Sequence, residues 1–168
     1  MFGRLDEELT ALTAAGVATE IIPGVTAAAA AAATLQVSLT QRGRNTRVTF
    51  LTAHDAKGYA EHDWQQLVDT EQTLAVYMGR KTAAFLQGRL LMHGANRLTP
   101  VTCIENVSRR DQRAFVSHLD EFVAALDEQR FKGPLMILVG IAGAVGASDL
   151  REQVNVVGAL EREQHGSY

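Results

Sequence analysis

Residues 135–140, LMILVG, form a short run that is apolar up to its closing glycine, and residues 73–77, TLAVY, form a second such run. Neither shows the regular polar and apolar alternation of a strand with one face in water. We therefore expect both to be strands that are covered on both faces. Because helices must then lie above and below the sheet, these two runs predict an α/β domain.

The segments around these two runs alternate between helical and strand patterns. Helices are predicted at residues 5–15, 27–33, 63–68, 82–92 and 119–126. Further strands are predicted at residues 18–22, 47–52, 101–105 and 112–117. This order predicts a single three-layer domain. Its sheet is expected to be mixed and mostly parallel, with five or six strands, helices on both faces and one antiparallel hairpin.

Composition excludes several classes of protein. The 168 residues include 16 Lys and Arg, 19 Asp and Glu, and 46% hydrophobic residues, which is enough for a core. A net charge of −3 argues against a general nucleic-acid binder. The single cysteine, Cys103, excludes an intrachain disulfide and a cysteine-based zinc site, and its apolar neighbours predict a buried, inert thiol. No apolar run reaches the ~18 residues that span a bilayer, and the start lacks a secretory core, so we expect a cytoplasmic protein without a membrane partner.

Other motifs leave alternatives open. The histidines lack metal-site spacing, so no metal is expected. His54 follows a predicted strand, and is either a ligand-site residue or a solvated loop residue. Glycines at 140, 143 and 146 lack the dinucleotide spacing GxGxxG, and favour close packing or a loose loop. Arg42, Arg44 and Arg47 form either a solvated loop or a site for carboxylate or phosphate groups.

Three short loops each follow a predicted strand: PGVTA at 23–27, MGR at 78–80 and ENVS at 105–108. Ligand crevices in α/β sheets lie at the carboxyl ends of strands. We therefore expect the three loops to share one crevice. Their small residues and backbone amides suit an extended polar ligand with an apolar face.

Taken together, these segments resemble the tetrapyrrole methylases, and among them the uroporphyrinogen-III C-methyltransferases. The matching segments, in the family's order, are PGVTA (23–27), SLTQR (38–42), FLTAH (50–54), DW (63–64) with Leu67, YMG (77–79), TPV (99–101), EN (105–106), QR (112–113) and GPLMILVG (133–140). Each segment alone is unspecific, but the ordered set covers nearly the whole chain.

The resemblance implies an enzyme and a division of labour. Residues 1–168 are similar to the C-terminal domain of the family, and residues 1–17 to its inter-domain helix, while the N-terminal domain with the assigned general acid and base has no counterpart here. The implied reaction is S-adenosylmethionine-dependent C-methylation of uroporphyrinogen III towards precorrin-2, on the route to cobalamin or sirohaem. This chain would then be inactive alone. The family also implies a homodimer and an exposed apolar strip where the absent domain would dock.

The resemblance carries five residues over. Thr26, Ala27, Met78 and Val107 match positions that bind S-adenosylmethionine, although the family has Gly or Ala in place of Val107. Arg42 matches an arginine on the side of the substrate, whose eight carboxylates suit guanidinium groups. No catalytic residue and no metal ligand is implied within this chain.

Two alternatives remain at this stage. One is a different methylase of the same fold that acts on a later cobalamin precursor. The other, from another functional class, is a non-catalytic binding or dimerisation module.

Overall fold

The structure is a computed structural model, and it describes residues 2–43, 45–55, 58–68 and 71–141. The helices are α1 (Leu5–Ala14), α2 (Ala27–Thr34), α3 (Trp64–Leu67), α4 (Ala83–Met92) and α5 (Phe122–Gln129). The strands are β1 (Arg47–Thr52), β2 (His54–Asp55), β3 (Gly58–Tyr59), β4 (Gln72–Tyr77), β5 (Pro100–Glu105), β6 (Arg113–His118) and β7 (Leu135–Val139).

Five strands form one mixed sheet in the order β1-β4-β7-β5-β6. The mixed sheet and the β5–β6 hairpin were both expected. The expectation of mostly parallel pairing is wrong, because only β1 and β4 pair in parallel, whereas β4–β7, β7–β5 and β5–β6 are antiparallel.

The insertion of β7 between β4 and β5 explains this difference. Helix α5 carries the chain from the end of β6 back to the edge where β6 began, so β7 runs in the direction of β6. Strands β4 and β5 run the opposite way. The local sequence predicts the helix that connects β6 to β7, but it does not predict that β7 lies between β4 and β5.

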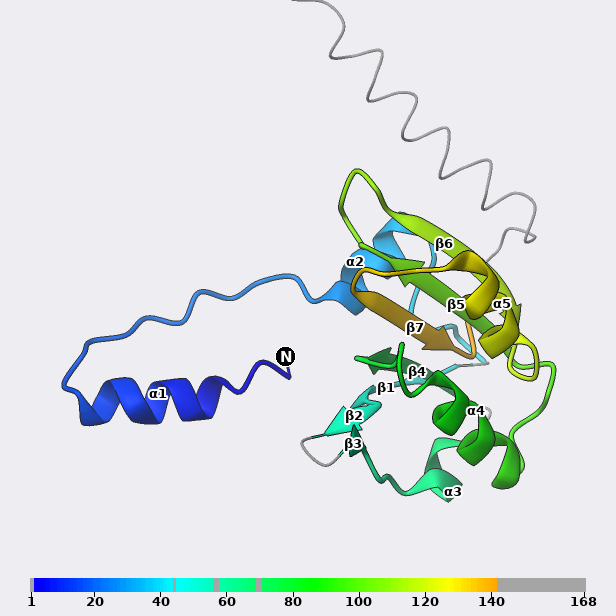
Figure 1. The fold of residues 1–168 in the computed structure, drawn as a ribbon, viewed down its shortest axis with the longest axis horizontal. Coiled ribbons are helices and arrows are strands. Elements are labelled where there is room, and N and C mark those ends of the chain that lie inside the picture. Colours follow the sequence, from blue (N-terminus) through cyan, green and yellow to red (C-terminus); the bar gives the residue numbers. More distant parts are fainter. Residues whose placement is uncertain (1, 44, 56–57, 69–70, 142–168) are drawn as a thin grey trace, which may run out of the picture.

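Two apolar clusters lie on the two faces of the sheet, as the α/β prediction requires (Figure 1). On one face, α3, α4 and α5 pack over side chains such as Leu74, Cys103 and Ile137. On the other face, α2 packs Ala28 and Ala31, both fully buried, against Ala75 and Leu138. All five residues of β7 are buried. The alanine helix suits this place because its small side chains allow a close approach to the sheet.

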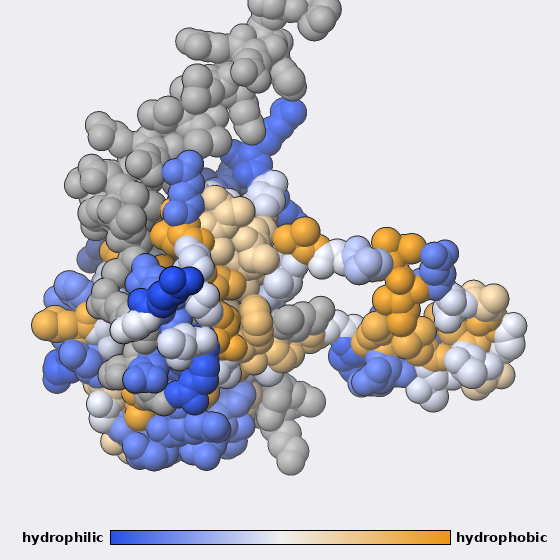
Figure 2. All heavy atoms as spheres, turned by 180° about the vertical axis from the view of Figure 1, so that it is seen from behind, coloured by the Kyte–Doolittle hydropathy of each residue, from blue (hydrophilic) through white to orange (hydrophobic). Residues whose placement is uncertain are grey.

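The N-terminal arm, residues 2–25, adds no buried residue to this core. Helix α1 forms as predicted, but it stands apart from the sheet (Figure 1). The strand predicted at residues 18–22 is absent, because this extended segment pairs with no strand in the described part of the chain. Its apolar side chains are exposed, with Ile22 at 73% and Val25 at 83%. In Figure 2 the arm that stands out from the domain shows apolar surface.

One small element was not predicted from the sequence, the two-stranded hairpin β2–β3. Residues Gly143 and Gly146 of the glycine pattern, and Arg44 of the arginine loop, lie outside the described residues. Cys103 is fully buried, as expected, and burial raises the pKa of its thiol, which disfavours the reactive thiolate.

A matched pair of leucine substitutions tests this core. We expect Leu138→Ala, at a fully buried position in β7, to lower the free energy of unfolding by about 3 kcal/mol, because it removes apolar contacts and leaves a cavity. Leu98→Ala, at a position that is 64% exposed, should cost less than about 1 kcal/mol. Urea denaturation followed by circular dichroism measures both, and equal losses would contradict the placement of β7.

Candidate functional site

One edge of the sheet gathers the ends of three neighbouring strands. Strand β4 ends at Tyr77, β5 ends at Glu105, and β7 begins between them, with Leu135 opposite Glu105 and Met136 opposite Tyr77. The backbone N–H of Asn106 donates to the Pro134 carbonyl at 3.0 Å. The loops after β4 and β5 therefore lie at the same edge of the sheet, and the loop before β7 lies with them.

The start of α2 is joined to the same edge through Tyr77. The hydroxyl groups of Thr26 and Tyr77 form a hydrogen bond, and the Tyr77 oxygen also accepts the Ala28 N–H at 3.3 Å. Val107 is half-buried and packs against the same apolar cluster as Ala28. The loop PGVTA at residues 23–27 thus lies at this edge as well, although no strand precedes it in the described part of the chain.

The structure consequently brings four of the five predicted site residues together. Thr26 and Ala27 open α2, Met78 follows β4, and Val107 follows β5. Ala27 is exposed and Met78 is 51% exposed, so both can touch a ligand.

Arg42 is placed elsewhere. It lies in an exposed turn that is closed by a hydrogen bond of 2.8 Å from the Gln41 N–H to the Asn45 carbonyl. The side chain of Asn45 in turn donates to the Gly140 carbonyl, just beyond β7, at 2.6 Å. This is the edge where β1 begins and β7 ends, opposite the edge of Met78. His54, by contrast, lies at the Met78 edge.

Backbone conformation marks both strand-end loops. Met78 has a φ of 56° and Asn106 a φ of 54°, in the left-handed region that is unfavourable for methionine but that asparagine adopts more readily than most residues. Such conformations cost of order 1–3 kcal/mol and concentrate at ligand sites. The sequence gives little warning of this, because neither position holds a glycine.

Two hollows open at this edge. The smaller, of about 350 Å³, is lined by His54, Met78, Arg80, Lys81, Lys132, Gly133, Pro134 and Leu135. The larger, of about 680 Å³, lies between the ends of β5 and α5, and its lining includes Glu105, Asn106 and Arg113. They share Lys132 and Gly133.

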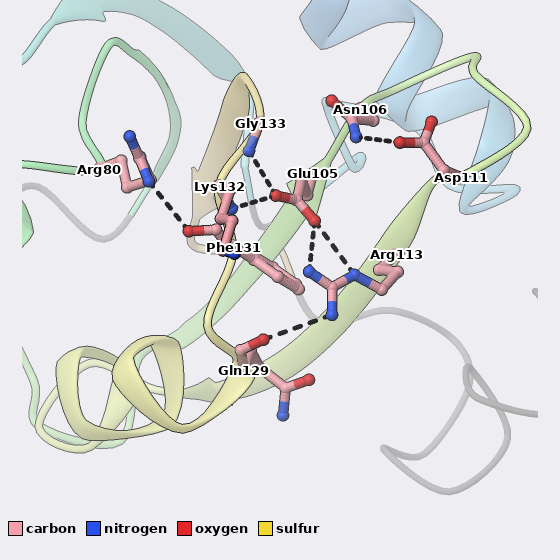
Figure 3. Close-up of polar contacts among 9 residues, drawn as sticks. All are labelled: Arg80, Glu105, Asn106, Asp111, Arg113, Gln129, Phe131, Lys132 and Gly133. Carbon is pink, nitrogen blue, oxygen red and sulfur yellow. Dashed lines mark hydrogen bonds and ion pairs between the residues drawn. The ribbon is translucent and has the colours of Figure 1, made fainter.

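The buried carboxylate of Glu105 binds the backbone of Lys132 and Gly133, the two residues that line both hollows (Figure 3). One oxygen accepts the backbone N–H groups of Lys132 and Gly133, the second at 2.5 Å. The other oxygen accepts both Nε and a terminal nitrogen of Arg113, at 3.0 and 2.6 Å. The Arg113 guanidinium also lies 4.6 Å from the centre of the Phe131 ring. Glu105 thereby ties β5, β6 and the entry to β7 into one unit.

Burial by itself raises the pKa of the Glu105 carboxyl, since it disfavours the charged form. The Gly133 N–H, the Arg113 guanidinium and the Lys132 N–H oppose this effect, and the net result is a lowered pKa. The carboxylate is therefore ionised at neutral pH and acts as a structural anchor, not as a proton donor.

Gly133 packs closely against Asn106 beside this anchor. A Cβ atom at this position would clash with the side-chain amide of Asn106, whose nitrogen donates to Asp111 at 2.7 Å, so a larger residue would displace that side chain.

The described residues include no cluster of three His, Cys, Asp or Glu side chains that could hold a metal ion. None of the described helices has the length and apolar character needed to span a membrane.

Comparison with known proteins identifies the family. Residues 1–123 match the Tetrapyrrole (Corrin/Porphyrin) Methylases. The chain belongs to this family. Tetrapyrrole methylases are methyltransferases, as the sequence resemblance implied, and S-adenosylmethionine is the methyl donor that the family and its S-adenyl homocysteine complex indicate.

Curated relatives agree with this assignment. The siroheme synthase of Pseudoalteromonas translucida is 38% identical over 140 residues, which are 83% of this chain and 30% of the relative. Siroheme synthase 2 of Aeromonas salmonicida is 39% identical over 140 residues, 83% of this chain and 29% of the relative. The chain thus spans about 30% of the length of the curated relatives that it matches.

Solved tetrapyrrole methylases share the fold. A cobalt precorrin-4 methyltransferase superposes with a TM-score of 0.76 at 24% identity, over 83% of this chain and 59% of that one. The uroporphyrin-III C-methyltransferase of Thermus thermophilus, complexed with S-adenyl homocysteine, gives 0.69 at 27% identity, over 83% of this chain and 60% of that one. The single α/β domain expected from the sequence is therefore confirmed.

The Glu105 anchor predicts a pH-dependent stability. Glu105→Gln should lower the free energy of unfolding at pH 7 by about 2–3 kcal/mol, because an amide cannot accept all four donors. Since folding lowers the pKa of Glu105, its contribution is complete at neutral pH and is lost as pH falls below the ordinary value of 4.5 through the folded-state pKa. The difference between the two proteins should therefore shrink in acid.

Urea denaturation at pH 7 and at pH 4 measures this difference. Glu128→Gln, the same change at an exposed position in α5, is the control and should have little effect at either pH. A Glu105→Gln protein as stable as wild type at pH 7 would contradict the anchor.

Proposed function

We propose that this chain supplies the cofactor side of an enzyme that C-methylates uroporphyrinogen III towards precorrin-2. The observation that carries the proposal is the meeting of Thr26, Ala27, Met78 and Val107 at one edge of the sheet. These are the residues that the family resemblance assigns to S-adenosylmethionine. The siroheme synthase relatives favour uroporphyrinogen III over a later cobalamin precursor.

The geometry of this edge suits an adenosyl group. Ala27 is exposed and adds only a methyl group at the start of α2. A Cβ atom on Gly79 would lie 2.8 Å from the buried Ile137 side chain, so glycine lets the turn after β4 pack closely on the core. Val107 departs from the family pattern. Part of its side chain packs against the apolar cluster that contains Ala28 and Ala31, and that part does not extend into the proposed cofactor site. The exposed thioether side chain of Met78 offers an apolar contact.

The chemistry requires alignment more than reactive side chains. S-Adenosylmethionine supplies an electrophilic methyl group on a sulfonium sulfur. The reacting pyrrole carbon of the substrate would have to be aligned with that methyl group, and the substrate would lose one proton. Thr26, Ala27, Met78 and Val107 would position the donor and exclude water. We assign no general acid or base to this chain.

The exposed arm suggests what completes the site. Ile21, Ile22 and Val25 form an apolar strip directly before Thr26. We propose that the N-terminal methylase domain covers this strip, that residues 1–17 form the helix between the domains, and that the complete enzyme is a cytoplasmic homodimer. A surface this apolar is typical of an interface.

Calorimetry with S-adenosylhomocysteine tests the function. We would compare this chain with a fusion that adds the N-terminal part of a siroheme synthase methylase domain. We expect the fusion to bind and to methylate uroporphyrinogen III, and the chain alone to bind more weakly without turnover. Binding by neither protein would overturn the proposal and favour a non-catalytic module, whereas turnover by the chain alone would refute the shared site.

Met78→Gly separates binding from stability. Glycine accepts the left-handed backbone at position 78, so strain relief should offset its entropic cost and leave the free energy of unfolding within about 1 kcal/mol of wild type. Loss of the side-chain contact should weaken S-adenosylhomocysteine binding by the fusion roughly tenfold.

Met92→Ala is the control, because Met92 is 77% exposed at the end of α4, away from the site. Isothermal titration and urea denaturation measure the two effects. Unchanged affinity in Met78→Gly would remove Met78 from the site.

A further inference from the structure

The hollow of about 350 Å³ beside Met78 has a cationic wall. Arg80 and Lys81 lie on its β4 side, and Lys132 lies on its β7 side. All three side chains are exposed, and no aspartate or glutamate is among the lining residues. This is notable in a chain whose net charge is −3.

These three cations are not neutralised within the described part of the chain. Four arginines elsewhere in this part have carboxylate partners: Arg4 pairs with Glu7, Arg89 with Glu61, Arg97 with Asp120 and Arg113 with Glu105. Arg80, Lys81 and Lys132 form no such pair there. Their positive charge is therefore available to an anionic ligand.

Hydrogen bonds hold the Arg80 side of the hollow against the segment that carries Lys132 (Figure 3). A terminal nitrogen of Arg80 donates to the Phe131 carbonyl at 2.9 Å, which leaves its other N–H groups free for a ligand. The next residue, Lys132, is held by its backbone N–H on the buried Glu105 carboxylate. The backbone that carries Lys132 is thus set before any ligand arrives, which reduces the entropic cost of binding.

We propose that Arg80, Lys81 and Lys132 form a carboxylate-binding site for the periphery of a polycarboxylate macrocycle. This inference rests on the proposed function, and it names how the same edge would hold the substrate. Arg80 offers a planar fork to one carboxylate, and the two lysines act as point charges for others. Their side chains border the hollow that Met78 also lines, whereas Arg42 lies at the opposite edge of the sheet.

Fluorescence titration with uroporphyrin III, the stable oxidised octacarboxylate, tests the site. We expect the double variant Arg80→Gln/Lys132→Gln to raise the Kd for uroporphyrin III at least tenfold. Uroporphyrin III binding by the wild-type chain should also weaken as salt concentration rises, because salt screens the charges. Arg97→Gln removes the same kind of charge from an exposed position far from the hollow and is the matched control. Its Kd should stay within about twofold of wild type.

Three results would overturn the proposal. They are the absence of uroporphyrin binding by wild type, an unchanged Kd in the double variant, and an equal loss in Arg97→Gln. Arg42→Gln distinguishes the two assignments, because a loss there without one in the double variant would place the carboxylates at the other edge. An unchanged melting temperature in the double variant excludes misfolding.

Failure of this inference is separable from failure of the proposed function. If the fusion still binds S-adenosylhomocysteine but the double variant leaves the Kd for uroporphyrin III unchanged, only the proposal of the carboxylate-binding site fails. If the fusion does not bind S-adenosylhomocysteine, the methyltransferase proposal itself fails.

Discussion

The Glu105 carboxylate is the interaction on which the site edge depends. It lies at the end of β5 and accepts hydrogen bonds from β6 and from the segment that leads into β7. An ionised carboxylate can be buried only when donors replace its water, and here four N–H groups do so. Because Lys132 and Gly133 are among these donors, the same contact shapes both hollows. The hydrogen bonds of Glu105 therefore set the position of backbone that lines both hollows.

The position of β7 has a similar role on a larger scale. Because β7 enters between β4 and β5 in the opposite direction, its first residues lie beside the last residues of both neighbours. The Gly133–Pro134 segment is thereby brought next to Met78 and Asn106, two residues with left-handed backbone conformations, of which that of Met78 is strained. The buried sheet beneath them provides the packing that holds this strain.

Charge and apolar surface are also separated by the fold. Arg80, Lys81 and Lys132, which form no ion pair within the described part of the chain, line the smaller hollow, while Ile21, Ile22 and Val25 lie exposed along the arm before α2. Thr26 stands at the junction between arm and site, held by Tyr77. The proposed function uses both kinds of surface, the cations for the substrate and the apolar arm for a second domain.

Local sequence predicted most of the helices and strands, because apolar runs such as 73–77 and 135–140 carry their own burial pattern, and the ordered motifs identified the family. It also indicated that the loops at Thr26, Met78 and Val107 belong together. Tertiary structure alone decided the antiparallel insertion of β7, the exposure of residues 18–22 and the distance of Arg42 from the site. It also brought Arg80 and Lys132 together, although they are about fifty positions apart in the chain. The physical reason is that strand pairing and charge proximity depend on long-range contacts, which leave no periodic signal in the local sequence.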